Sequence, residues 1–221
     1  MELETRAPSY KDGLKELRKN LGQMLPPEAL KKFDNDADGL AEAHKSVLKI
    51  NVGDKAPDFS LVNAVGKNIR LSDLLINNKV VITFYRGTWC PYCNLQLSQY
   101  QQILNEIRDA GASFIAISPQ TPDESLNMTE KNDLKFEVLS DIGNMVARKF
   151  TTVFKNGDMP VQTMTELGFD FDAHYGDDSR ELPVPAVFII EKNGNVSFAK
   201  AVSGDYRERV DAAEILNELR K

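Results

Sequence analysis

The sequence predicts an α/β protein in which a central sheet is covered by helices on both faces. Short apolar runs typical of buried strands alternate with stretches whose apolar residues recur every three or four positions, the spacing of a helix. Strands separated by helices of this length belong to sheets with two covered faces. With 42% hydrophobic residues among 221, the chain has enough apolar material for such a core.

The first 49 residues predict a helical arm that packs on the main domain. Apolar residues with helical spacing form two stretches within 9–48, interrupted by Pro26-Pro27 and by the acidic run 34–38. The charged side chains of this arm are most simply a solvated face, and we expect no catalytic role for them.

The main domain, residues 50–221, shows alternating strands and helices. The expected strands are 80–84, 113–118, 136–139, 186–190 and 196–202. The expected helices are 95–107, 122–132, 144–150 and 210–219. Turns at 64–67 and 193–195 are typical of hairpins, and Ser72-Asp73 is typical of a helix cap.

An insertion occupies residues 151–183 and is longer than a simple connection needs. Such segments often form lids or binding surfaces. A partly ordered surface loop with a short helix at 161–167 is the simpler interpretation, and both stay open. Exposed Phe or Met side chains on the insertion or the arm would suit a homodimer.

Charge and composition exclude several classes of partner. The chain has 33 acidic and 27 basic residues, a net charge of -6, and no basic patch interleaved with aromatic residues. We therefore expect neither nucleic acid nor an anionic membrane as a partner. Residues 1–6 lack the features of a signal peptide, and no apolar run approaches the length of a membrane span, so the expected location is cytoplasmic.

The two cysteines, Cys90 and Cys93, lie where the strand 80–84 gives way to the following helix. A thiol at a helix N-terminus faces unpaired N–H groups and the positive end of the helix dipole, which favour the nucleophilic thiolate. Two residues between the cysteines allow a disulfide across the first turn. This pattern predicts a redox pair in which Cys90 is the more accessible and more acidic thiol.

Other uses of paired cysteines fit the sequence less well. A structural zinc site needs four ligands, and the two histidines, His44 and His174, lie far from the cysteines in the sequence. Two core cysteines would not need the polar and turn-forming neighbours present here. A disulfide that closes so short a loop restricts the unfolded chain little. We expect no metal and no bound cofactor, and nothing in the sequence ties His174 to Cys90 as a base.

Three motifs resemble the alkyl hydroperoxide reductase and thiol-specific antioxidant family over roughly residues 50–221. They are Gly53-x-x-Ala56-Pro57-x-Phe59, the strand that ends at the paired cysteines, and the hairpin 188–194. The segments 86–93, 117–122 and 182–186 are similar to a peroxiredoxin-like branch of that family.

The resemblance implies a thioredoxin fold with a central mixed sheet and an antioxidant peroxidase activity. A hydroperoxide would be the substrate, with Cys90 as nucleophile and Cys93 as resolving thiol. An external donor, thioredoxin-like or glutathione-like, would then reduce the disulfide.

Three positions depart from the pattern of ordinary peroxiredoxins. That family places Thr or Ser three residues before the reactive cysteine, Pro seven before it, and an Arg just before the late hairpin strand. Here Gly87, Thr83 and Pro185 stand at those places. Arg86 and Thr88 could substitute by supplying a positive charge and a hydroxyl donor. A surface ion pair is an equal interpretation of Arg86.

The same region is also similar to thioredoxins and glutaredoxins. Trp89-Cys90 matches the start of the thioredoxin motif, and Cys90-Pro91-Tyr92-Cys93 is the glutaredoxin tetrapeptide. The resemblance implies a cis-proline at Pro185 that walls the site together with Trp89, whereas a trans proline at a strand edge is the alternative. A disulfide oxidoreductase and a redox-regulated binding protein therefore stay open beside the peroxidase.

Overall fold

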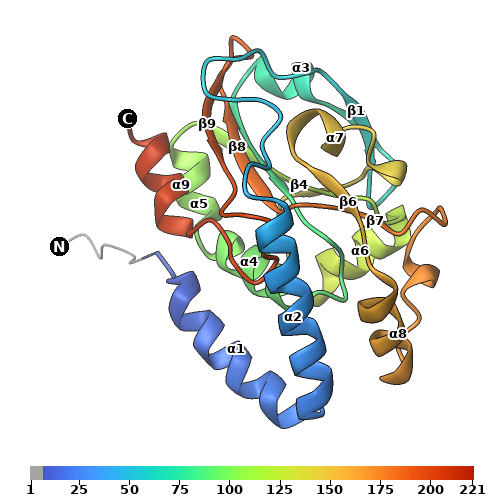
Figure 1. Ribbon diagram of the computed structural model, residues 1–221. Helices are drawn as coiled ribbons and strands as arrows, with labels where there is room; N and C mark the ends of the chain where they lie inside the picture. The colour runs from blue at the N-terminus through green and yellow to red at the C-terminus, as the bar shows by residue number, and fades with distance from the viewer. Residues whose placement is uncertain (1–6) are drawn as a thin grey trace.

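A seven-stranded mixed sheet forms the centre of the structure (Figure 1). Its strands are β1 (Ser60–Asn63), β2 (Asn68–Arg70), β3 (Lys79–Phe84), β4 (Ala112–Ser118), β5 (Glu137–Ser140), β8 (Ala186–Ile190) and β9 (Val196–Lys200). They are ordered β2-β1-β5-β4-β3-β8-β9, with β3, β4 and β5 parallel and the other neighbours antiparallel. A separate antiparallel pair joins β6 (Val153–Lys155) to β7 (Glu181–Pro183).

The computed structural model describes residues 7–221. The segment 1–6, on which the prediction of no signal peptide rested, lies outside the described residues. Within 7–221, no helix is both long enough and apolar enough to cross a membrane.

Helices cover both faces of the sheet, which confirms the predicted class. The α-helices are α1 (Tyr10–Met24), α2 (Pro27–Ala43), α3 (Leu71–Leu75), α4 (Pro91–Gln102), α5 (Leu104–Asp109), α6 (Pro122–Lys131), α7 (Ala147–Phe150), α8 (Asp158–Glu166) and α9 (Ala212–Leu219). Two 3-10 turns are η1 (Ile142–Asn144) and η2 (Asp172–His174). Side chains of α4, α5, α6 and α9 form the core on one face, and those of α3 and α7 on the other.

β3 is an interior strand of the sheet, and its side chains are apolar on both faces. Val80 and Ile82 pack in one core, whereas Val81 packs in the other, and all three are fully buried. A strand covered on both faces has the continuous apolar run seen in this sequence. The chain leaves β3 at Phe84 and enters α4 at Pro91, so the cysteines lie just beyond the end of an interior strand.

The predicted arm is present as α1 and α2, which form a hairpin that projects beyond the sheet in Figure 1. The break at Pro26-Pro27 is confirmed, but the break predicted at 34–38 is wrong because α2 continues through it. Asp34 accepts hydrogen bonds from Arg18, 2.7 Å away, and Arg207, 3.1 Å away. These ion pairs offset the weak helix preference of the acidic run, so this face is not simply solvated.

Other local predictions differ from the structure by small shifts. The cap predicted at Ser72-Asp73 is wrong, since α3 begins at Leu71 and Asp58 accepts from the Ser72 N–H at 3.0 Å. The expected helix 95–107 is divided at Ile103 into α4 and α5. The helix expected at 144–150 consists of η1 followed by the shorter α7.

The insertion 151–183 contains β6, α8, η2 and β7 rather than a partly ordered loop. Its helix begins at Asp158, three residues before the predicted start. Val161, Phe171 and Leu182 bury their side chains in a third apolar core, which also includes Val47. The domain boundary near residue 50 stays a prediction.

Gly204 marks a close approach between the C-terminal segment and the arm. A Cβ at this position would lie 2.2 Å from the Leu40 carbonyl oxygen of α2. We expect Gly204→Ala to lower the free energy of unfolding by about 1–3 kcal/mol, the usual range for overpacking. Gly39→Ala, beside Leu40 on α2, is the control: no neighbouring atom is found within 4 Å of its added Cβ, and alanine in a helix should raise the free energy of unfolding by up to about 1 kcal/mol. Urea denaturation of both variants and of the wild type is the measurement, and a midpoint for Gly204→Ala no lower than that of the wild type would contradict the close approach.

Candidate functional site

Cys90 and Cys93 lie at the first turn of α4, both buried, with 1% and 0% of their surfaces exposed. Cys90 is the N-cap residue, and its carbonyl accepts hydrogen bonds from the N–H groups of Cys93 and Asn94. Asn94 also donates its side-chain amide to the carbonyls of Thr88 and Cys90, at 2.8 Å each. These bonds fix the turn that carries both thiols, which are free cysteines.

Arg209 brings a buried positive charge to both sulfurs. Its Nη2 lies 3.3 Å from the Cys93 Sγ and 4.0 Å from the Cys90 Sγ. Its Nη1 donates to the main-chain carbonyls of Tyr206 and Glu208. The guanidinium therefore spans the distance from the C-terminal segment to the cysteine pair.

The electrostatics favour a thiolate on Cys93, so the prediction that Cys90 is the more acidic thiol is wrong. Burial raises the pKa of Cys90, and its hydrogen bond to Cys93 raises it further. Burial also raises the pKa of Cys93, but the Cys90 hydrogen bond, the Arg209 charge and the Arg86 N–H together lower it well below the usual range. These opposite directions favour a state in which the two thiols share one proton and one negative charge.

Arg86 is a buried residue of the site, so its interpretation as a surface ion-pair residue is wrong. Only 2% of its surface is exposed. Its guanidinium carbon lies 3.9 Å from the centre of the Tyr206 ring and 4.8 Å from that of Trp89. Cation–π attraction holds the charge there, while the Arg86 main-chain N–H points at the Cys93 sulfur, 3.5 Å away.

Thr88 does not hold its hydroxyl ready for a peroxide, as the substrate-binding role predicted for it requires. The hydroxyl donates to the Glu124 carboxylate at 2.9 Å and accepts from the Gln120 amide at 3.3 Å. Gln120 also accepts from the Thr88 N–H at 2.7 Å. Thr88 therefore links the loop between β3 and α4 to α6 and to the end of β4. Its hydroxyl and its N–H both form their hydrogen bonds with those elements.

Trp89 connects the loop to the insertion. Its indole N–H donates to the Tyr175 hydroxyl at 2.8 Å, and that hydroxyl donates to the Arg86 carbonyl at 2.9 Å. A Cβ at Gly87 would lie 2.6 Å from the Trp89 Nε1 and 3.0 Å from Gln120. This crowding explains why glycine stands where ordinary peroxiredoxins carry Thr or Ser.

Pro185 does not occupy the predicted role. Within residues 7–221 there is no cis peptide bond, so the cis prediction is wrong and the bond takes the trans form that X-Pro bonds ordinarily prefer. Pro185 is buried and does not line the cavity beside Cys90. The Val184 N–H donates to Thr152 at 2.8 Å, and the Val184 carbonyl accepts from Thr151 at 3.1 Å. Neither main-chain group is free to receive a substrate.

A cavity of about 420 Å³ opens beside Cys90. Arg86 and Trp89 line it as well, but Cys93, Thr88 and Pro185 do not. Much of its apolar wall comes from the arm and the insertion, through Leu25, Leu30, Phe33, Met164, Leu167 and Phe169. Among the described residues that line it there is no carboxylate, whereas Lys131 adds a second cation.

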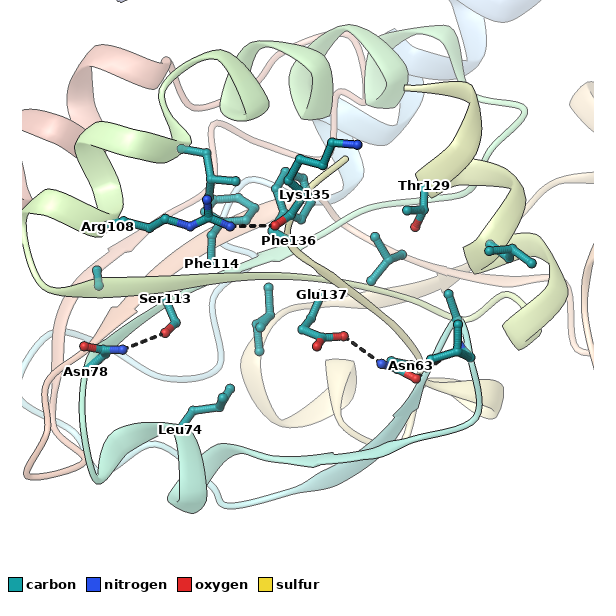
Figure 2. A pocket seen from close by; sticks show the side chains of 17 residues that line it. Asn63, Leu74, Asn78, Arg108, Ser113, Phe114, Thr129, Lys135, Phe136 and Glu137 are labelled. Carbon is teal, nitrogen blue, oxygen red and sulfur yellow. Dashed lines mark hydrogen bonds between the residues drawn. The ribbon is translucent and has the colours of Figure 1, made fainter. Parts of the chain in front are cut away.

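A larger cleft of about 560 Å³ lies beside β4 and β5, away from the cysteines (Figure 2). Apart from Lys135, which pairs with Asp133, its labelled polar side chains bind one another or the main chain. Asn63 donates to Glu137 at 2.8 Å, Asn78 to Ser113 at 3.2 Å, and Arg108 to a main-chain carbonyl at 2.7 Å. Because these groups are satisfied internally and no thiol is present, the cleft beside Cys90 is the better candidate site.

Neither histidine belongs to the cysteine site. His44 lies against the Phe154 ring, and His174 stacks on Phe169, with ring centres 4.6 Å apart and its Nδ1 2.9 Å from Glu124. Zinc binding by the cysteines and histidines together is therefore unsupported. The sequence reasoning missed Arg209 and Tyr206, because no local motif marks the segment that carries them.

Comparison with known proteins identifies the family. Residues 52–199 match the model of the AhpC/TSA family. The chain is 37% identical over 98 residues to a putative peroxiredoxin of Buchnera aphidicola, covering 44% of this chain and 61% of that protein. It is 31% identical over 101 residues to peroxiredoxin Bcp of Escherichia coli, covering 46% and 64%. The matches thus span about three fifths of these relatives.

Solved structures agree on the fold. Peroxidoxin BcpB of Mycobacterium tuberculosis superposes with a TM-score of 0.60 at 23% identity, covering 77% of this chain and 97% of that one. A peroxiredoxin-like protein from Aquifex aeolicus gives a TM-score of 0.59 at 19% identity, covering 77% and 86%. These likenesses confirm the thioredoxin fold predicted from the sequence. With its family model matched over most of its length, the chain belongs to the AhpC/TSA family.

Proposed function

We propose that this protein is a thiol-dependent hydroperoxide reductase in which Cys90 is the nucleophile and Cys93 the resolving thiol. The observation that carries the proposal is a buried cysteine pair in contact with the Arg209 guanidinium, of which one member, Cys90, lines a cavity. The peroxiredoxin names of its relatives support the same chemistry.

The reaction would begin with the proton that the two thiols share. When this proton lies on Cys93, Cys90 is the thiolate and attacks the terminal oxygen of the hydroperoxide, breaking the O–O bond. Cys90 becomes a sulfenic acid, and the leaving alkoxide takes the proton from Cys93, which leaves Cys93 as a thiolate. The Cys93 thiolate then displaces hydroxide from the sulfenic sulfur, and the resulting disulfide is reduced by an external thiol donor.

Arg209 and Arg86 are suited to the charges of that reaction. Arg209 touches both sulfurs, so it stabilises the thiolate whichever cysteine carries it. Arg86 lines the cavity with Cys90 and supplies positive charge where the alkoxide develops. These two arginines would together serve the function of the arginine that Pro185 replaces.

The cavity favours an organic hydroperoxide. Liquid water occupies about 30 Å³ per molecule, so hydrogen peroxide alone would fill only a small part of the cavity. Apolar walls from the arm and the insertion would bind the organic group and exclude water from the sulfur. The external thiol donor, a homodimer and a cytoplasmic location stay predictions.

A disulfide oxidoreductase remains the alternative because of the Cys-Pro-Tyr-Cys motif. Docking of a partner disulfide by strand pairing beside Pro185 would need free main-chain groups on Val184. Both main-chain groups of Val184 are instead occupied by Thr151 and Thr152, which disfavours this alternative.

Two assays on the purified protein distinguish these activities. We expect a higher catalytic efficiency for consumption of an organic hydroperoxide, with a thioredoxin system as donor, than for reduction of insulin disulfides. Cys90→Ser should abolish peroxide consumption because a serine alkoxide is inaccessible near neutral pH. Faster insulin reduction would favour the oxidoreductase, and activity in Cys90→Ser would refute the assigned nucleophile.

The resolving role of Cys93 predicts different oxidation products in the wild type and in Cys93→Ser. After one equivalent of hydroperoxide, the wild type should lose about two mass units as the disulfide forms, whereas Cys93→Ser should gain about sixteen as a sulfenic acid. Intact-protein mass spectrometry makes the comparison. Sustained multiple turnover by Cys93→Ser with glutathione would instead mean a one-cysteine cycle.

A further inference from the structure

The segment 204–211 is bound to the N-terminal arm along its length. The Gly204 N–H donates to the His44 carbonyl at 2.9 Å, and the Tyr206 hydroxyl donates to the Phe33 carbonyl at 2.7 Å. At the other end, the Asp211 carboxylate accepts from the Tyr10 N–H at 3.0 Å. The arm thus holds both ends of this segment and a point between them.

The middle of the segment is bound through Arg207. Its guanidinium pairs with Asp34 at 3.1 Å and with Asp38, both on α2, while its carbonyl accepts from the Tyr10 hydroxyl at 2.8 Å. Asp34 also pairs with Arg18, which donates to the Tyr92 hydroxyl at 3.2 Å. A continuous polar network therefore joins the cysteine motif, the arm and the segment.

Arg209 is the residue of this segment whose guanidinium contacts the two sulfurs. An arginine side chain loses considerable rotamer freedom when it is buried, so its position depends on a fixed backbone. The carbonyls of Tyr206 and Glu208, which hold its Nη1, lie between the points bound by the arm. Displacement of Arg207 would therefore move both the backbone and the acceptors of Arg209.

We propose that the N-terminal arm is a positioning element of the thiol site, which holds residues 204–211 so that Arg209 contacts both cysteine sulfurs. Arg207, Asp34 and Asp38 are its positioning residues. The arm and this segment both lie outside the family-matched residues 52–199, so membership of the family does not supply this device. The inference rests on the proposed function only in taking a thiolate as the reacting species.

Among the titratable and charged groups that face the cysteines, Arg86 and Arg209 supply the positive charge. Tyrosines from the arm, the cysteine loop, α4, the insertion and the C-terminal segment face the pair, and burial raises the pKa of each: Tyr10, Tyr85, Tyr92, Tyr175 and Tyr206. They stay neutral across the working range. Arg86 and Arg209 are the charged groups that act on the sulfurs, so loss of Arg209 from its place changes the thiol titration.

A charge exchange between Arg207 and Asp38 tests the proposal. Alkylation of Cys90 by iodoacetamide, followed by peptide mapping across a pH series, is the measurement. Arg207→Glu should move the pH profile upward by about one unit and slow alkylation about tenfold at neutral pH, since one pKa unit is a tenfold change in thiolate. Adding Asp38→Arg to Arg207→Glu should restore much of the wild-type profile.

Arg70→Glu is the matched control, because it breaks a surface ion pair with Asp58 and changes the charge by the same amount. It should leave the profile unchanged. If Arg207→Glu does not fold, the uncharged double variant Tyr10→Phe/Tyr206→Phe removes two bonds to the arm and should shift the profile in the same direction.

A wild-type profile in folded Arg207→Glu, or in the double tyrosine variant, would overturn the positioning role. So would a failure of Asp38→Arg to restore the profile. Because the measurement needs no peroxide, its outcome is independent of whether the protein is a peroxidase.

Discussion

The contact between the Arg209 guanidinium and the two sulfurs is the interaction on which the rest of the site depends. A buried ion without a partner is unfavourable by several kcal/mol, and this holds for the arginine and for a thiolate alike. The guanidinium lies 3.3 and 4.0 Å from the two sulfurs, so the buried arginine stabilises a thiolate and the thiolate stabilises the buried arginine. The contact consequently favours one proton and one negative charge on the pair inside an otherwise apolar core.

The structural elements around this contact each hold one part of it or build the cavity beside it. The turn at Cys90 holds the sulfurs together, and the segment 204–211 supplies the arginine. The arm fastens that segment and, with the insertion, builds the apolar wall of the cavity. Arg86 between Trp89 and Tyr206 adds charge on the cavity side. The chemistry therefore draws on parts of the chain before, within and after the family-matched residues.

Local patterns in the sequence were sufficient for most of the fold. The bounds of four elements lie within about a residue of those predicted: β3, β4, α6 and β8. Burial on both faces gives a continuous apolar run and a helix gives a periodic one, and both patterns involve residues that are neighbours in the sequence. The start of α4 at the cysteines was predicted for the same reason. The run 34–38 failed as a helix break because its partners, Arg18 and Arg207, are distant in the sequence.

Only the site residues that lie close together in the sequence were predicted correctly. Cys90, Cys93, Arg86 and Trp89 share one loop and are found together. Arg209 contacts Cys93 from 116 residues away, a pairing that no local pattern reveals. Thr88 and Pro185 were given wrong roles because their surroundings come from other elements. The Thr88 hydroxyl bonds to Glu124 of α6, and the carbonyl of Val184, which precedes Pro185, accepts from Thr151.

Titration of the reduced protein with carbon-13-labelled cysteine, followed by NMR, tests the shared charge most directly. An ordinary cysteine thiol has a pKa of about 8.5. If Arg209 holds the pair as a monoanion, one cysteine, assigned to Cys93, should titrate well below that value and Cys90 well above it. Replacement of Arg209 by methionine should bring the lower transition back toward the ordinary value. Two transitions together near the ordinary thiol pKa in the wild type would contradict the account.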